Sequence, residues 1–112
     1  MKELNKFIYI FEGLDTAHGI TKKSDQINEK GKNKTTSFTI HKPPIEKLWQ
    51  DHLDGKDPGL GIIPINQENK LKWGCIDVDI YPVNHQDFVK KLQEKNIKAI
   101  VFRSKSGGAH IF

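Results

Sequence analysis

The chain has 112 residues, of which 36% are hydrophobic and 29% charged, and its formal net charge is +4. This length predicts one small domain, residues 1–112, with a single core, and the composition excludes a wholly disordered chain. No apolar run approaches the length of a membrane span, so we expect no membrane partner. The excess of basic residues gives modest support for a polyanionic partner.

The chain has a single cysteine, Cys75, and five histidines. One cysteine excludes an internal disulfide framework and is typical of a protein from a reducing cytoplasm. The histidines show no metal-ligand spacing with Cys75, so a zinc site is not expected. We therefore expect a cytoplasmic protein in which Cys75 is a small packing residue rather than a nucleophile.

The first part of the chain is predicted to hold one strand and a long polar loop. Residues 7–11 are entirely apolar and predict a strand that ends near Gly13. Residues 21–37 are almost entirely polar, with five lysines and two acidic residues between Lys22 and Lys34. This composition predicts a solvated, mobile basic loop, and the alternative is a lysine-rich flap that contacts nucleic-acid backbone.

A strand, a helix and an extended segment are predicted next. Residues 37–41 alternate like a short strand, and two prolines at 43–44 are typical of the start of a helix. The helix has apolar residues at helical spacing, including Trp49 as a core residue, and Gly55 is a plausible stop. Residues 60–65 contain glycine and proline among apolar residues, which favours an edge strand or an extended segment.

Residues 74–81 predict a strand with two carboxylates on one face. Successive side chains of a strand point to opposite faces, so Asp77 and Asp79 share a face with Cys75 and Tyr81. The two aspartates would lie roughly 6–7 Å apart along the backbone, so both can lean towards one cation. Hard oxygen ligands suit Mg²⁺ or Mn²⁺, and Mg²⁺ typically joins one or two carboxylates to substrate phosphates.

A helix and two more strands are predicted after the aspartates. Asn84 is a candidate helix cap, and Asn96 is a candidate left-handed stop. Residues 98–102 then form a strand, which completes a βαβ unit whose two strands should be parallel. In a last strand over residues 109–112, His110 would project towards the face that carries the aspartates.

The loop 103–108 joins these two strands and combines small residues, hydroxyl groups and cationic side chains. Glycines let backbone N–H groups approach a phosphate closely, and cationic side chains neutralise its charge. Phosphoryl transfer depends on positioning and metal charge more than on covalent chemistry. The aspartate strand and this loop together therefore predict a metal-dependent nucleotidyl-transfer site.

Two stretches carry a resemblance to a known family: residues 73–79 (Trp-Gly-Cys-Ile-Asp-Val-Asp) and residues 103–110 (Arg-Ser-Lys-Ser-Gly-Gly-Ala-His). Together they resemble the first two motifs of the archaeo-eukaryotic primase superfamily, and more closely those of the primase-polymerase domains of phage and mobile-element replication proteins. The resemblance covers residues 59–112 and is weaker over residues 7–53. It implies an α+β fold with an incomplete RRM-like primase-polymerase core: a βαβ unit plus a hairpin, with helices on one face.

The resemblance also implies roles for individual residues. Asp77 and Asp79 would hold Mg²⁺ or Mn²⁺, and His110 would be catalytic with them. The residues implied in binding the nucleotide are Arg103, Ser104, Lys105, Ser106, Gly107, Gly108 and His110. The implied partners are nucleoside triphosphates, a single-stranded DNA template, and a helicase domain or downstream polypeptide. The implied setting is the cytoplasm of a bacterium or a phage-infected cell.

The sequence departs from the family at two points. The family often has a serine two residues before the histidine, where this chain has Gly108, so Ser106 is expected to cover that role. The family also needs a third acidic residue on a later strand, and this sequence ends at Phe112. We therefore expect an amino-terminal portion of a primase-polymerase domain, which by itself would bind metal weakly and polymerise poorly or not at all.

Three functions stay open at this stage. The first is DNA primase or polymerase activity, and the second is nucleic-acid binding by an RRM-like module without catalysis. Such a module predicts exposed aromatic residues on its sheet, whereas this sheet is predicted to expose aspartates. The third is a metal-dependent nuclease, which also uses paired carboxylates. The alternative without a functional site is that Asp77 and Asp79 are solvated surface charges and that His110 is structural.

Overall fold

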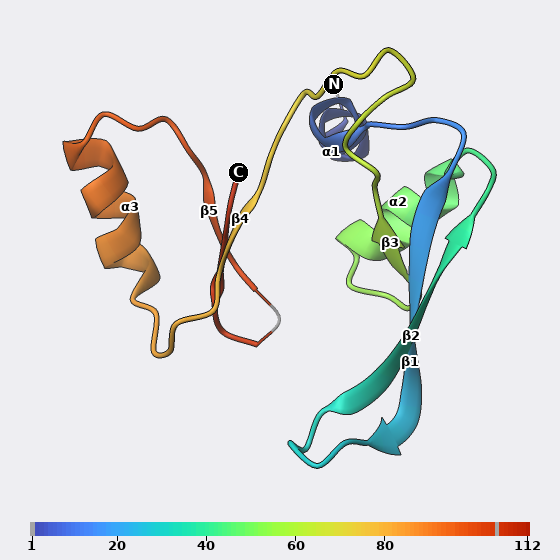
Figure 1. The fold of residues 1–112 in the computed structure, drawn as a ribbon, viewed down its shortest axis with the longest axis horizontal. Coiled ribbons are helices and arrows are strands. Elements are labelled where there is room, and N and C mark those ends of the chain that lie inside the picture. Colours follow the sequence, from blue (N-terminus) through green and yellow to red (C-terminus); the bar gives the residue numbers. More distant parts are fainter. Residues whose placement is uncertain (1, 105) are drawn as a thin grey trace. The chain divides into compact units, whose positions relative to one another are not determined.

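The structure is a computed structural model that describes residues 2–104 and 106–112. In these residues the chain is an α+β protein with three helices and two three-stranded antiparallel sheets (Figure 1). Its contacts divide it into two compact units, a first unit of residues 1–72 and a second unit of residues 73–112. None of the described helices is long and apolar enough to cross a membrane.

The first unit contains two helices and one sheet. Its elements in chain order are α1 (Glu3–Phe11), β1 (His18–Ile27), β2 (Asn33–Ile40), α2 (Glu46–Leu53) and β3 (Gly59–Gly61). The strand order is β2-β1-β3, and β1 is antiparallel to both neighbours. β3 therefore lies at an edge of the sheet, which confirms the edge position predicted for this segment.

The first element is a helix, so the prediction of a strand over residues 7–11 is wrong. When the polar residues before this run are included, apolar side chains recur at the helical spacing i, i+3, i+4 and i+7: Leu4, Phe7, Ile8 and Phe11. The ring of Phe7 packs 5.1 Å from Phe11 and edge-on at 5.8 Å from Trp49. A short apolar run alone does not distinguish a strand from part of a helix.

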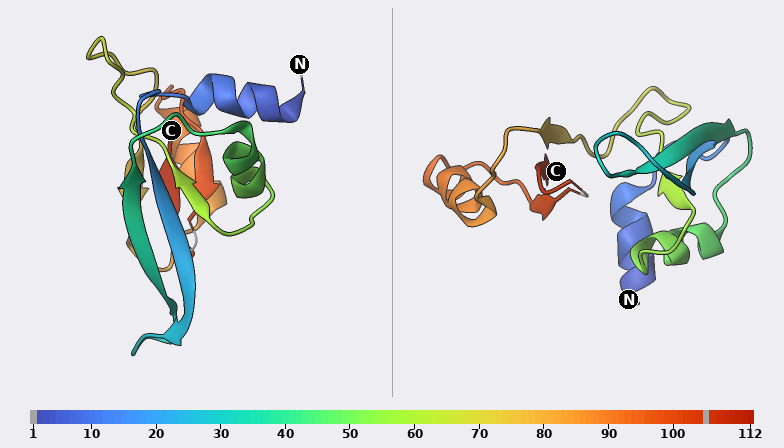
Figure 2. Two further views of the ribbon diagram at one scale, coloured as in Figure 1. Left: turned by 90° about the vertical axis from the view of Figure 1, so that its right-hand side faces the viewer. Right: turned by 90° about the horizontal axis from the view of Figure 1, so that it is seen from below.

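Residues 21–37 form most of a β-hairpin, where the sequence predicted an irregular loop. β1 and β2 pair from His18 opposite Ile40 to Lys23 opposite Thr35. β-branched threonines favour extended backbone even in a polar segment. Beyond α1 and α2 the hairpin continues as a two-stranded ribbon that neither helix covers (Figures 1 and 2). It therefore has no buried face there and shows no alternation of apolar and polar residues.

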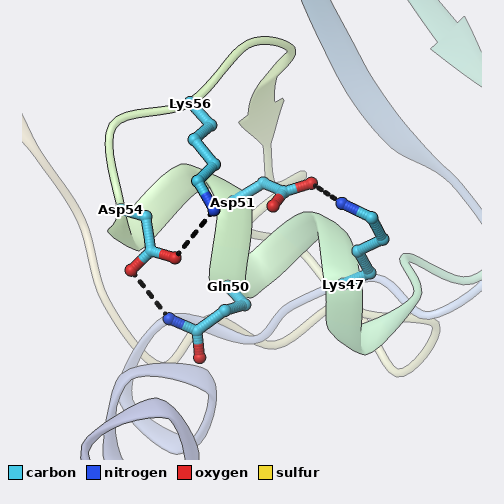
Figure 3. Close-up of polar contacts among 5 residues, drawn as sticks. All are labelled: Lys47, Gln50, Asp51, Asp54 and Lys56. Carbon is cyan, nitrogen blue, oxygen red and sulfur yellow. Dashed lines mark hydrogen bonds and ion pairs between the residues drawn. The ribbon is translucent and has the colours of Figure 1, made fainter.

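The helix α2 confirms the prediction made from its apolar spacing. Its Trp49 is a core residue with 4% of its surface exposed, and Gly55 follows the helix with φ +71°. Polar contacts link side chains along and just after α2 (Figure 3): Lys47 with Asp51, Gln50 with Asp54, and Lys56 with Asp54. The other buried residues of the first unit are Ala17, His18, Ile20 and Asp51.

The second unit contains one helix and one sheet. Its elements are β4 (Ile76–Val78), α3 (His85–Glu94), β5 (Val101–Arg103) and β6 (Ala109–Ile111). The strand order is β4-β6-β5, and β6 is antiparallel to both neighbours. β4 and β5 therefore run parallel to each other, as predicted, but β6 lies between them. The unit is a split β-α-β arrangement rather than a pair of adjacent parallel strands.

Both ends of α3 agree with the caps predicted from the sequence. The side chain of Asn84 accepts a hydrogen bond from the backbone N–H of Asp87 at 3.1 Å. Asn96 has φ 53°, and its N–H donates to the carbonyl of Gln93. β4 is shorter than the predicted strand of residues 74–81, because its only partner in the sheet, β6, pairs with it over three residues.

Candidate functional site

Asp77 and His110 face each other across two neighbouring strands. They are directly paired in the β4–β6 ladder, so their side chains lie on the same face of the sheet. The Nε2 atom of His110 lies 3.4 Å from Oδ1 of Asp77, and the two side chains are 42% and 60% exposed. The alternation of the strands predicted this placement of His110, and the exposure leaves both groups accessible to a ligand.

Asp79 lies beyond the end of β4, so it is not held by the sheet. The hydroxyl of Tyr81 donates a hydrogen bond to its Oδ1 at 3.3 Å. Over residues 2–104 and 106–112, no three His, Cys, Asp or Glu side chains are grouped so as to hold a metal ion. Hydrated Mg²⁺ needs only one or two protein carboxylates beside phosphate and water oxygens. The exposed oxygens of Asp77 and Asp79 therefore fit the donor chemistry of Mg²⁺ or Mn²⁺.

The loop between β5 and β6 is a closed turn. The N–H of Gly107 donates to the carbonyl of Ser104 at 3.0 Å, and the N–H of Ser104 donates to the carbonyl of Gly108 at 2.9 Å. These two N–H groups are therefore used inside the turn. Ser106 is exposed, and Lys105, one of the predicted nucleotide-binding residues, lies outside the described residues.

Gly108 is required by its close approach to the neighbouring strand. A Cβ atom at this position would overlap the carbonyl oxygen of Val78 in β4. It would also lie 3.1 Å from Oγ of Ser104 and 3.3 Å from the hydroxyl of Tyr81. The glycine thus has a packing reason at this position. It also brings the hydroxyls of Ser104 and Tyr81 to the same place.

The hydroxyl of Ser104 is buried and has no hydrogen-bond partner among the described residues. A buried polar group without a partner generally costs about 1–3 kcal/mol, so native structures rarely leave one unsatisfied. The hydroxyl lies on the side of the turn that meets Gly108 and Tyr81. Of the two loop serines, Ser104 is therefore the one whose buried hydroxyl lacks a hydrogen-bond partner that a water or ligand could supply.

His85 is a residue of this site that the sequence analysis missed. It is the first residue of α3, and its Nε2 lies 2.7 Å from the carbonyl oxygen of Gly108. This contact ties the start of the helix to the turn between β5 and β6. The sequence feature that could have indicated a role for His85 is its position. It directly follows the helix cap Asn84 in the connection between the aspartate strand and α3.

An open groove of about 470 Å³ lies beside this contact. Its described lining comes from the segment that enters α3 and from β5: Pro82, Val83, Asn84, His85, Gln86 and Arg103. Arg103 supplies a permanent positive charge, and the first turn of a helix also favours an anion. The groove therefore suits a phosphate or carboxylate group better than a cation.

Cys75 precedes β4 and is exposed. Partial burial of its sulfur raises the pKa of the Cys75 thiol, and the negative charge of Asp77 raises it further, against a hydrogen bond with the backbone of Ile111 that lowers it. A raised pKa keeps the group as a neutral thiol near pH 7, and a thiol is a poor nucleophile. Nucleophilic catalysis by Cys75 therefore has no support from its surroundings.

Comparison of the chain with protein-family models, curated proteins and solved structures finds no match. The resemblance to primase-polymerase domains stays a prediction from two sequence motifs. The functional argument therefore depends on the geometry of the Asp77–His110 pair, the Ser104–Gly108 turn and the Arg103 groove.

Proposed function

We propose that the second unit forms part of a nucleotidyl-transfer site of the primase-polymerase type, which binds a nucleoside triphosphate together with Mg²⁺ or Mn²⁺. The observation that carries the proposal is the pairing of Asp77 with His110 across β4 and β6. It brings one residue of each sequence motif onto one exposed face of the sheet. The expected role is template-directed DNA synthesis in phage or mobile-element replication, with single-stranded DNA as the template.

Charge is the main physical argument for a metal at this site. Asp77 and Asp79 would repel the phosphates of a nucleotide, and a divalent cation removes this repulsion. When bound, the metal would supply the positive charge that a transferred phosphoryl group needs. Asp77 and Asp79 are the residues that would hold it, and His110 would donate a hydrogen bond to a phosphate oxygen beside Asp77.

The phosphate contacts in this proposal come from side chains more than from the backbone. Two N–H groups of the turn, those of Ser104 and Gly107, are already engaged inside it. The exposed hydroxyl of Ser106 is therefore assigned to the triphosphate. Arg103 pairs with Ala109 and so lies on the face opposite Asp77 and His110, where it lines the groove beside α3. His85 is a positioning residue, because it holds the carbonyl of Gly108 and with it the shape of the turn.

Calorimetric titration of the chain with a nucleoside triphosphate, with and without Mn²⁺, tests the proposal. We expect binding that requires the metal and that falls at least about tenfold in Asp77→Asn, because a hydrogen-bonded metal ligand is lost. Asp25→Asn is the matched control, since Asp25 is an exposed carboxylate of the first unit. Binding that does not need metal and survives Asp77→Asn would contradict the proposal.

One observation favours a second candidate function, nucleic-acid binding by an RRM-like module without catalysis. Phe102 is 45% exposed and lies directly opposite His110 on the β5–β6 ladder, so an aromatic ring shares the face with Asp77. Such modules stack bases on exposed aromatics of their sheet. Metal-independent binding of an RNA oligonucleotide that is lost in Phe102→Leu and kept in Asp77→Asn would support this candidate instead.

A further inference from the structure

A second concave surface lies in the first unit, at the base of the β1–β2 hairpin. It is a groove of about 320 Å³ whose described lining comes from β1, β2, the segment leading into α2 and α2 itself, together with Pro58. Most of the lining is apolar, including Phe38, Ile45 and Leu48, while Lys22 and Lys42 supply two positive charges. None of the described residues that line it is acidic. We call this surface the hairpin groove.

Phe38 and Lys22 both line the hairpin groove and contact each other. Ile20 pairs with Phe38 and Lys22 pairs with Thr36 in the β1–β2 ladder, so Phe38 and Lys22 lie on one face. The ammonium of Lys22 lies 5.6 Å from the centroid of the Phe38 ring, within the range of a cation–π contact. The ring is nevertheless 41% exposed. An exposed aromatic ring beside a cation is a stacking surface with a charge for a phosphate next to it.

The rest of the hairpin continues this charge along the ribbon. Its lysines outnumber its acidic residues by five to two, and all seven side chains are exposed: Lys22, Lys23, Lys30, Lys32, Lys34, Asp25 and Glu29. The ribbon extends past α1 and α2 in Figure 1 and in the left panel of Figure 2. A positively charged track that leaves an aromatic-lined groove is the arrangement by which proteins bind single-stranded nucleic acid.

We propose that the hairpin groove and the β1–β2 ribbon bind single-stranded nucleic acid. A base stacks on Phe38, the adjacent phosphates contact Lys22 and Lys42, and the distal lysines of the ribbon follow the backbone. This site lies within the first unit and uses no residue of the proposed nucleotidyl-transfer site. Either proposal can therefore fail without the other.

Charge and shape favour this occupant over two others. A base reaches Phe38 only when it is unpaired, so a duplex would contact the lysines but not the ring. An apolar peptide would fill the groove but would leave the charge of Lys22 and Lys42 without a counterpart. A groove of about 320 Å³ also lies near the lower end of ligand clefts, roughly 300–1,000 Å³, which suits a nucleoside rather than a folded partner.

Fluorescence anisotropy of the whole chain with a labelled oligothymidine of about a dozen nucleotides tests the proposal. We expect Phe38→Leu, which keeps the apolar volume, to weaken binding about tenfold, because base stacking is lost. The double change Lys22→Gln/Lys42→Gln should weaken binding and reduce the magnitude of the slope of log affinity against log salt by about 1.4. Both variants should melt near the wild-type temperature by circular dichroism.

The matched control is Lys90→Gln/Lys98→Gln, which removes two exposed lysines of the second unit. We expect this control to leave oligothymidine affinity within about twofold of wild type, because neither lysine lies in the hairpin groove. The proposal is overturned by equal losses in the groove and control pairs, by an unaffected Phe38→Leu, or by a preference for duplex DNA. Absence of oligothymidine binding overturns it too, and binding of an apolar peptide would then assign the groove to a peptide.

Discussion

The two sheets of this protein are built by the same antiparallel pairing and present opposite chemistry. The β1–β2 ribbon of the first unit exposes lysines around Phe38, whereas the β4–β6 pair of the second unit exposes Asp77 beside His110. A basic surface attracts phosphate directly. An acidic one attracts it only through a cation, so the two surfaces predict different dependence on salt and on divalent metal.

The two units also differ in how their sheets are anchored. The first unit buries Trp49 of α2, which contacts Phe7 of α1, together with Ala17, His18 and Ile20 around the start of β1. The second unit buries little more than Ala109 and Ile111 of its central strand. The basic surface therefore stands on a larger apolar core than the acidic surface does. Substitutions that destabilise one unit and leave the other intact test this difference in stability most directly.

The largest effect is expected from Trp49→Ala. Truncating a buried aromatic residue costs about 3–5 kcal/mol, because contacts are lost and a cavity remains. We expect the helical signal of the first unit to be lost at a lower urea concentration, measured by far-UV circular dichroism. The chain has only two tryptophans, so the fluorescence of Trp73 then reports the second unit alone. An equal shift of both transitions would show that the two units unfold as one.

A smaller effect is expected from Gly108→Ala in the second unit. The added methyl would overlap the carbonyl of Val78, and relief of such overlap typically costs about 1–3 kcal/mol. Gly74→Ala is the matched control in the same unit, since a Cβ there meets no other atom within 4 Å. With both changes made in a Trp49→Phe background, fluorescence reports Trp73 alone. We expect its transition to shift in Gly108→Ala and to stay in place in Gly74→Ala. Similar shifts in both variants would refute the close approach of β6 to β4.

Much of the second unit could be predicted from the sequence because its signals are local. Asn84 and Asn96 mark the ends of α3 by cap chemistry, and strand alternation places His110 opposite Asp77. The position of β6 between β4 and β5 was not predictable in the same way. It depends on which strand edge the last segment joins, and no local pattern encodes that choice.

The first unit was harder to predict because the secondary structure of its segments depends on residues outside those segments. Residues 7–11 looked like a strand until the apolar spacing was counted from Leu4. The hairpin over residues 21–37 has no buried face along its ribbon, so polar composition was mistaken for irregular structure. The role of His85 was missed because its partner, the carbonyl of Gly108, is distant in sequence.

The smallest effect concerns Cys75, whose thiol reports the charge of Asp77. Burial and the Asp77 carboxylate together raise the pKa of Cys75. Because the folded pKa is raised, the protonated thiol stabilises the fold at neutral pH, and this contribution is lost as pH rises through the folded pKa. In Asp77→Asn one of the two causes is removed, so we expect the pKa of Cys75 to fall modestly but to stay raised by burial.

The rate of iodoacetamide alkylation against pH measures this change, because only the thiolate reacts. Cys75 is the single cysteine, so the rate belongs to one site. We expect the profile of Asp77→Asn to move to lower pH, and that of Asp25→Asn, which removes a carboxylate of the first unit, to stay in place. If Mn²⁺ binds at Asp77, adding it to the wild type should move the profile in the same direction, since the cation cancels the same charge. A profile that changes with neither the substitution nor the metal would show that the charge of Asp77 does not affect the thiol. The contrast between a basic first unit and an acidic second unit would then lose its support.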